Sequence, residues 1–217
     1  MDYITKGDTI IFSLDFNENL DINLISGYAK LIFSNYKLND KLFWAYENSN
    51  FDGLEFQYSE FNQEVNNLPQ NITHLIFGFY FNKEVNNLPQ CLTYLTFDYD
   101  FNQEVNNLPQ DLTHLTFGVK FNQLVDCLPS SIVEITFGNR FNQKIENLPT
   151  SIHKIIFSAY GIFDTELNCL PNFVEFLQLP AKYDKKISNL PKELKEIVCS
   201  KNYKYVSDFS NLNVIYY

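Results

Sequence analysis

The sequence is poor in basic residues, glycine and tryptophan, and it contains no long apolar run. Its 217 residues include 16 Lys and Arg against 26 Asp and Glu, which gives a formal net charge of -10. Nucleic-acid binding needs clustered cations, so this balance argues against a nucleic-acid partner. No apolar stretch approaches the roughly 18 residues of a membrane-spanning helix, and the start MDYITKGDTI lacks the order of a secretory signal. We therefore expect no membrane partner and a cytoplasmic location.

Residues that carry catalysis are also scarce. The 4 cysteines form no CxxC pair, and the 3 histidines offer no base beside a thiol or hydroxyl in the sequence. We expect reduced thiols and a protein that is not an enzyme, with no catalytic, cofactor-binding or metal-binding residues.

What the sequence does contain is a copied unit. FNQEVNNLPQ occupies 61–70 and returns at 101–110, with FNKEVNNLPQ at 81–90 between them. Self-similarity at a fixed period of this length is typical of solenoids, in which stacked units bury a common core. The period is 20 residues with one step of 22, and it is marked by Leu-Pro pairs that begin at Leu68, Leu88, Leu108, Leu128, Leu148, Leu170 and Leu190.

Each unit contains a short stretch of alternating polarity, such as HLIFG at 74–78. This pattern predicts a strand with Leu75 and Phe77 inward and with His74 and Ile76 outward. A 20-residue unit leaves little room for a returning helix, so we expect loops, turns or short 3₁₀ pieces there. The predicted fold is a repeat solenoid whose strands form a parallel β-sheet of leucine-rich-repeat type.

An asparagine follows the first phenylalanine of each unit. Its short amide can satisfy backbone groups between neighbouring layers of a loop-rich stack. We interpret these residues as a structural ladder rather than a binding site: Asn62, Asn82, Asn102, Asn122 and Asn142.

The outward strand positions form the best candidate for a partner-binding face, because exposed Tyr, His and Ile beside Thr can anchor a protein. A metal site is disfavoured, because His74 and His114 are two layers apart, or about 10 Å. A second row, formed by Glu64, Glu84 and Glu104, is either a solvated face or a site for a cation or basic partner. The residues of the candidate face are His74, Ile76, Tyr94, Thr96, His114, Thr116, Glu134, Thr136, Lys154 and Ile156.

Residues 1–50 differ from the rest. Apolar residues from Leu20 to Ile32 fall at helical spacing, so we expect a small helical module there, followed by a solenoid with a C-terminal cap over 51–217. Leu54–Phe56 would be the first, incomplete coil. The alternative is that Ile10 and Leu31 belong to degenerate strands of the same solenoid. At the other end, 213–217 is either a cap or an open edge that forms a homodimer.

The unit FNQEVNNLP, together with the pattern I-x-x-L-x-F at 72–77, resembles the FNIP repeat of social amoebae and giant amoeba-infecting viruses. The resemblance covers about residues 54–200, although most units have 20 rather than 22 residues. Members often carry an N-terminal F-box, and residues 10–46 are similar to its general order without the usual Leu-Pro-x-Glu opening. The resemblance implies docking to a Skp1-type adaptor, with these candidate residues: Leu14, Leu20, Leu24, Leu42, Phe43 and Trp44.

Two functions follow as hypotheses. In the first, the chain is the substrate receptor of a host ubiquitin ligase and its repeats capture a protein in the host cytoplasm. In the second, it is a free-standing binding or decoy module without a link to ubiquitin.

Overall fold

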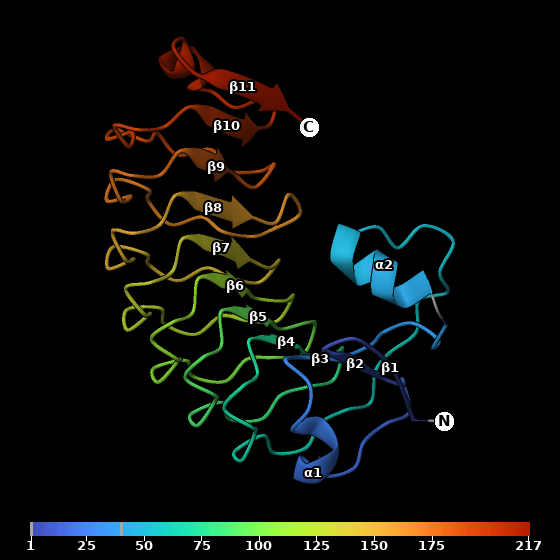
Figure 1. Ribbon diagram of the computed structural model, residues 1–217. Helices are drawn as coiled ribbons and strands as arrows, with labels where there is room; N and C mark the ends of the chain where they lie inside the picture. Colours follow the sequence, from blue (N-terminus) through green and yellow to red (C-terminus); the bar gives the residue numbers. More distant parts are fainter. Residues whose placement is uncertain (1, 40) are drawn as a thin grey trace.

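The repeated units of the sequence form equivalent, stacked turns of the structure. In the computed structural model, which describes residues 2–39 and 41–217, the chain winds into a stack whose strands form one 11-stranded sheet in sequence order (Figure 1). The strands are β1 (Tyr3–Lys6), β2 (Thr9–Phe12), β3 (Lys30–Phe33), β4 (His74–Ile76), β5 (Tyr94–Thr96), β6 (His114–Thr116), β7 (Glu134–Phe137), β8 (Lys154–Phe157), β9 (Phe176–Gln178), β10 (Glu196–Cys199) and β11 (Asn213–Tyr216). The helices are α1 (Ile22–Ile25), α2 (Lys41–Asn48) and the 3₁₀ helix η1 (Val206–Phe209).

The register of the sheet follows the sequence period. Leu75 pairs with Leu95, and Leu95 pairs with Leu115, so equivalent residues become vertical neighbours. All pairs from β2 to β11 are parallel, whereas β1 pairs antiparallel with β2 at the N-terminal end. The predicted parallel solenoid is therefore confirmed.

The return path of each turn is built from loops and turns. After each Leu-Pro pair the chain reverses, and the proline carbonyl accepts a hydrogen bond from the residue three positions on, as in Pro89 to Leu92 at 3.1 Å. Proline suits this corner because its ring fixes φ and it has no N–H to leave unpaired. This turn directs Leu92, the residue whose N–H donates to the proline carbonyl, into the core, where it is fully buried.

The core is a continuous column of phenylalanine rings. Within one turn Phe77 stacks on Phe81 with ring centroids 3.6 Å apart, and Phe81 lies 6.1 Å from Phe101 in the next turn. Phe81 and Phe101 are 1% and 0% exposed. Each turn from β4 to β8 thus adds two buried rings to the spine, whereas Leu179 and Cys199 take the place of the second ring in the next two turns. Burial of such large apolar surfaces is the main stabilising term of the stack.

The helical module expected over residues 1–50 is not what forms. Ile10 and Leu31 lie in β2 and β3, they pair with each other, and Leu31 also pairs with Leu75 of β4. The alternative interpretation, that these segments are degenerate strands of the same solenoid, is confirmed. Tertiary packing overrides the helical spacing because Ile10 and Leu31 are fully buried in the shared core as strand residues. Between residues 20 and 32 the helix is confined to Ile22–Ile25, and it begins where the Asp21 side chain accepts from the N–H of Asn23. The other helix described within residues 1–50 is α2, outside the stack.

The segment that departs from the stack is residues 34–60, which we call the insertion. It leaves after Phe33 and returns at Phe61, and these two rings stack with centroids 3.8 Å apart. The insertion carries α2, which lies beside the strands in Figure 1. Our prediction that Leu54–Phe56 forms the first coil is wrong. Phe56 forms an isolated antiparallel bridge with Tyr36 inside the insertion, and not a strand of the stack.

Candidate protein-binding face

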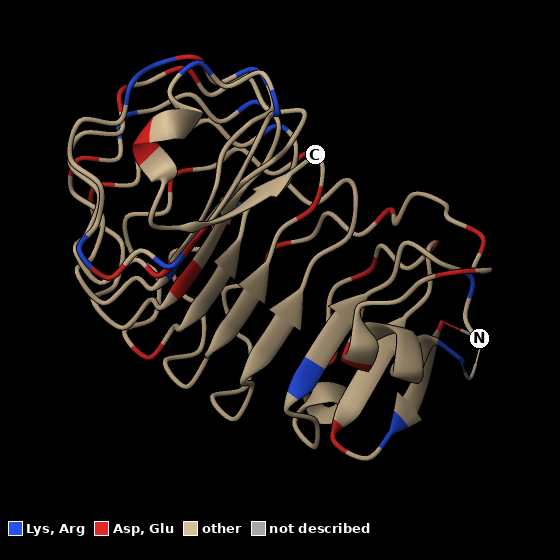
Figure 2. Ribbon diagram, turned by 90° about the horizontal axis from the view of Figure 1, so that it is seen from above, with Lys and Arg blue, Asp and Glu red and all other residues tan. Residues whose placement is uncertain are grey.

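The candidate face consists of the outward residues of β4 to β8. All ten residues that we predicted from the sequence lie on these strands, where they alternate with buried residues. The strand ribbons in Figure 2 are largely free of charge, and most charged residues lie on the loops. The face is therefore a mixed aromatic, aliphatic and hydroxyl surface that carries one charged pair, Glu134 and Lys154.

Three rings form a stack at one end of the face. His74 and His114 lie on opposite sides of Tyr94, with centroids 4.3 Å and 4.1 Å from it and interplanar angles of 10° and 13°. Tyr94 is 40% exposed, so the stack offers an aromatic anchor of the kind that recurs in protein interfaces.

The protonation of the two histidines follows from their neighbours. The Thr113 hydroxyl donates its hydrogen to the Thr93 carbonyl at 3.0 Å, so it accepts from Nδ1–H of His114 at 2.9 Å. The same arrangement joins Thr73 to His74 at 2.9 Å. Burial lowers the pKa of His114 and of His74, and Lys30 lowers the pKa of His74 further. Both rings are thus favoured as neutral groups with Nε2 as the acceptor.

Further along the face the character changes. Lys154 pairs with Glu134 at 3.0 Å, which neutralises both charges within the column. The neighbouring column holds Thr96, Thr116 and Thr136, with Ile76 and Ile156 at its two ends, and all five are half-buried. The apolar and aromatic residues are therefore concentrated at the β4–β5 end.

At that end α2 and the strands enclose a groove of about 430 Å³. Its floor runs across four strands, and Phe43, Tyr46 and Glu47 of α2 form one wall. The floor residues are Thr9 of β2, Lys30 and Ile32 of β3, His74 and Ile76 of β4, and Tyr94 and Thr96 of β5. We did not predict this wall. Its signal in the sequence is the apolar spacing of Phe43 and Tyr46, which shows a helix face but not where the helix lies.

The helix α2 is held on the outer side of the sheet by a small second core. Leu42 and Phe43 are buried at 0% and 7% exposure against Ile11 and Ile32, which point outward from β2 and β3. The Tyr46 hydroxyl donates to Ser34 Oγ at 3.3 Å, and burial raises the pKa of Tyr46 to about 12.

The base of the insertion is fixed to the repeats by Asn35. Its Oδ1 accepts from the backbone N–H of Ser59 at 3.1 Å and of Phe79 at 3.0 Å, and its Nδ2 donates to Asp98. Burial raises the pKa of Asp98, and the Asn35 hydrogen bond partly offsets this shift. These contacts tie the position of α2 to the turns that form the floor of the groove.

The six adaptor-docking candidates do not form one surface. Leu14, Leu42 and Phe43 are buried, whereas Trp44 is 54% exposed. Leu24 is half-buried against the core. The helix order of an F-box is not reproduced, because the Ile10 segment is strand β2.

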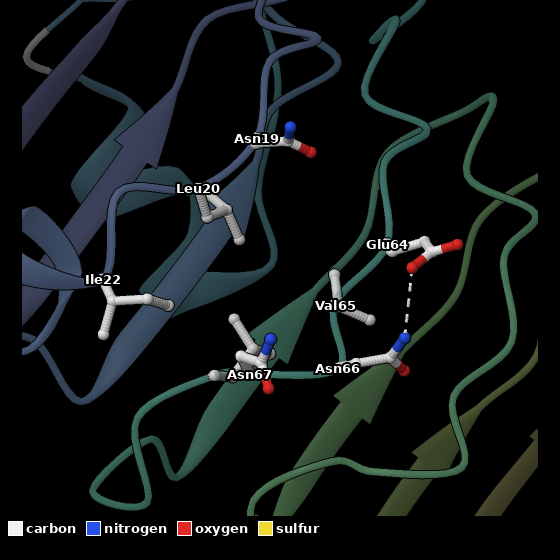
Figure 3. Close-up of a pocket in the computed structure, with 8 residues that line it drawn as sticks. Asn19, Leu20, Ile22, Glu64, Val65, Asn66 and Asn67 are labelled. Atoms are coloured by element: carbon white, nitrogen blue, oxygen red, sulfur yellow. Dashed lines mark hydrogen bonds between the residues drawn. The ribbon is translucent and has the colours of Figure 1, made fainter.

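Leu20, the remaining candidate, lies on the return side of the stack. It lines a cavity of about 240 Å³ together with Ile22, Val65 and Leu68 (Figure 3). Leu20 is half-buried there and is therefore not a free docking residue. Glu64 accepts from Asn66 Nδ2 at 3.3 Å at the polar rim of this cavity.

The asparagine residues form a ladder along the stack. Oδ1 of Asn62 accepts from the N–H of Asn82 at 2.9 Å, and Oδ1 of Asn82 accepts from Asn102 in the same way. The ladder continues to Asp164, whose N–H donates to Asn142 at 2.8 Å. It begins at Asn17, which we did not predict, and which accepts from Asn62 at 2.9 Å. The pair Phe16-Asn17, four residues after Phe12, is the signal that was missed.

The acidic row is held by local amides. Glu84 and Glu104 accept from Asn86 at 3.3 Å and Asn106 at 3.2 Å. These side chains are exposed, which fits a solvated row. Across residues 2–39 and 41–217, no helix has the length and apolarity needed to cross a bilayer.

Comparison with known proteins agrees with the repeat architecture. The FNIP Repeat family model matches residues 81–120, 104–139 and 121–160. A search of curated proteins found no match.

Among solved structures, the chain is similar to CroV588, whose crystal structure is described as a novel circular LRR protein structure. The identity is 29% and the TM-score is 0.70. The match covers 94% of this chain, which spans only 32% of CroV588.

Proposed function

We propose that this chain captures a protein partner on the strand face of β4 to β8. The FNIP Repeat matches and the solenoid of leucine-rich-repeat type support this proposal, because such solenoids bind partners along their exposed surfaces. The proposed place of action is the cytoplasm, or the host cytoplasm if the chain is viral. The observation that carries the proposal is the exposed stack of His74, Tyr94 and His114 beside the groove of α2.

The other surfaces support a partner less well. The return side is lined by amides and carboxylates, many of which already bond to one another, such as Asn106 to Glu104. Interface hot spots are instead enriched in aromatic residues that sit beside apolar floors. Tyr94 and Ile76 supply that combination on the strand side.

Site-specific photo-crosslinking tests this function. A benzophenone amino acid replaces Thr116 on the strand face or Asn106 on the return side, and each variant of the 217-residue chain is irradiated in lysate of the cells in which the protein occurs. We expect a discrete adduct from position 116 and none from position 106. Equal labelling from both positions, or adducts from position 106 alone, would contradict the proposal.

A second candidate function adds adaptor docking, which would make the chain the receptor subunit of a ubiquitin ligase. The observation in its favour is Trp44, which is 54% exposed on a helix outside the stack. Pull-down with a purified Skp1-type adaptor tests it, with Trp44→Ala as the discriminating variant. Binding that is lost in this variant supports adaptor docking. Absence of binding by the parent chain rejects adaptor docking and leaves protein capture as the proposed function.

We also propose that the chain forms a homodimer through β11. Ile215 and Tyr216 of this strand are 42% and 45% exposed, and Tyr217, which follows the strand, is 44% exposed. Unpaired strand edges with exposed apolar residues favour pairing with a second chain. The oligomeric mass in solution is measured with and without residues 213–217. A fall from dimer to monomer supports the proposal, and an unchanged mass rejects it. The milder variant Ile215→Lys keeps the strand and serves as the folding control.

A further inference from the structure

We infer that the groove between α2 and strands β4 and β5 receives an amphipathic α-helix of the partner, laid beside α2 on the strand face. This inference rests on the proposed function and specifies the chemistry of the partner segment. The segment needs an apolar stripe, and it needs its backbone hydrogen bonds satisfied before it docks.

The fold already contains one helix packed on the outer side of this sheet. α2 lies on the outer side of β2 and β3, with Leu42 and Phe43 on Ile11 and Ile32. Ile32 and Ile76 are paired neighbours in the same outward column, so the surface that accepts α2 continues into the groove. The floor at Ile76 and Tyr94 thus extends an established helix-on-sheet contact.

The spacing of the elements favours a second helix at this position. Packed helices lie about 8–10 Å apart, and neighbouring strands about 4.8 Å apart. A helix beside α2 therefore sits about two strands further along the sheet. Since α2 covers β2 and β3, that place is over β4 and β5. The groove of about 430 Å³ begins at Thr9 of β2 and at Lys30 and Ile32 of β3, and it extends across β4 and β5 to Thr96.

The wall of the groove is also suited to a helix. Phe43, Tyr46 and Glu47 are three and four positions apart, so they project from one side of α2 toward the groove. An apolar row at i, i+3, i+4 and i+7 of an incoming helix matches this side and the floor together.

An extended peptide is a poorer match. It would need free backbone groups at a sheet edge, but β4 pairs with β3 on one side and with β5 on the other. The face offers only side chains, so an extended segment would leave its own N–H and C=O groups unpaired on binding.

Two displayed peptide libraries of equal size test the inference against the full chain. One has apolar residues at i, i+3, i+4 and i+7, and the other has the same composition in strict alternation. We expect binders from the helical library only, and their circular dichroism should gain helicity on binding. Selection of extended binders alone, or recovery from neither library, overturns the inference.

Matched variants locate the binding site of the selected peptides. Ile76→Glu and Thr96→Lys change the floor of the groove, and the matched control Ile162→Glu changes an isoleucine that is 61% exposed in the loop after β8, outside the face. Fluorescence anisotropy should show at least about tenfold weaker binding for the first two, equivalent to roughly 1.4 kcal/mol, and a change within about twofold for the third. Circular dichroism of each variant establishes that it is folded.

Unchanged binding by both Ile76→Glu and Thr96→Lys overturns the inference even if helical peptides are recovered. The failure of this inference is distinguishable from the failure of the proposed function. Crosslinking from position 116 without any helical binder rejects the helix alone, whereas the absence of strand-face crosslinking rejects the proposed function itself.

Discussion

Phe33 and Phe61 stack with ring centroids 3.8 Å apart although the whole insertion of residues 34–60 separates them in the chain. Phe77 and Phe81, which are four positions apart, stack at 3.6 Å in the same way. The insertion therefore enters and leaves the stack at one join between two core rings. Because the core is complete without it, the insertion can place α2 over the strand face without interrupting the spine.

Loss of one ring of the spine should strongly destabilise the stack. Phe101→Ala removes a fully buried ring that contacts Phe81 and Phe97, and large-to-small changes of this kind cost about 3–5 kcal/mol. Urea unfolding followed by circular dichroism measures the free energy of unfolding. The control is Tyr160→Ala at a residue that is 87% exposed, which should leave the midpoint within experimental error.

The ladder predicts a difference between two substitutions at one position. Asn102→Ala leaves the N–H of Asn122 without the acceptor that now lies 2.8 Å away. This donor is part-buried, so its loss should cost no more than the about 1–3 kcal/mol of a buried unsatisfied donor. Asn102→Asp keeps an acceptor oxygen and should retain most of the stability. Equal destabilisation of the two variants in urea unfolding would show that the bond contributes little.

A close approach of two backbones predicts that Gly118 cannot be replaced. A Cβ at Gly118 would lie 2.0 Å from the carbonyl oxygen of Asp98, so the turns would have to move apart. We expect Gly118→Ala to lower stability by more than about 1 kcal/mol, as overpacked sites do. Gly27→Ala is the matched control, because no atom lies within 4 Å of its added Cβ. Differential scanning calorimetry compares the two, and similar Tm values would contradict the predicted clash.

The histidine stack predicts a dependence of stability on pH. Burial lowers the pKa of His74 and His114, so the unfolded chain binds protons near its ordinary pKa of about 6.5 that the folded chain does not bind. Stability should therefore fall as the pH drops below about 6.5 and level off once the folded rings also protonate.

Thermal unfolding at about pH 7.5 and about pH 5.5 measures this dependence, over the range in which a free imidazole titrates. A chain carrying both His74→Gln and His114→Gln should lose less stability between these conditions than the parent. His153→Gln changes an exposed histidine outside the stack and should behave like the parent. If the double variant and the parent show the same loss, burial of these rings is not the cause.

The sequence was sufficient to predict the fold wherever the repeat is intact. Fixed spacing placed Leu75 and Phe77 inward and His74 and Ile76 outward, because the alternation of a strand depends on local geometry alone. It also placed the asparagine side chains beside the backbone of the next layer.

The N-terminal region was harder because its signals conflict. The spacing of residues 20–32 fits a helix, while Ile10 and Leu31 gain more by joining the common core as strands. The Leu-Pro pairs start only at Leu68, so Phe16-Asn17 was not recognised as part of a unit, and the insertion displaced Phe33 from Phe61. The groove could not be predicted, because the position of α2 depends on long-range contacts of Asn35 and Leu42.

The ladder bond runs always from the amide N–H of one turn to the asparagine of the turn before it. Since the acceptor is an asparagine in each of these consecutive turns, the contacts between one pair of adjacent turns are equivalent to those between the next pair. Excision of residues 101–120 would therefore place Phe121 and Asn122 on Phe81 and Asn82 with the same ladder hydrogen bond. The length of the solenoid can therefore be altered by duplication or deletion of whole units without redesign of its core.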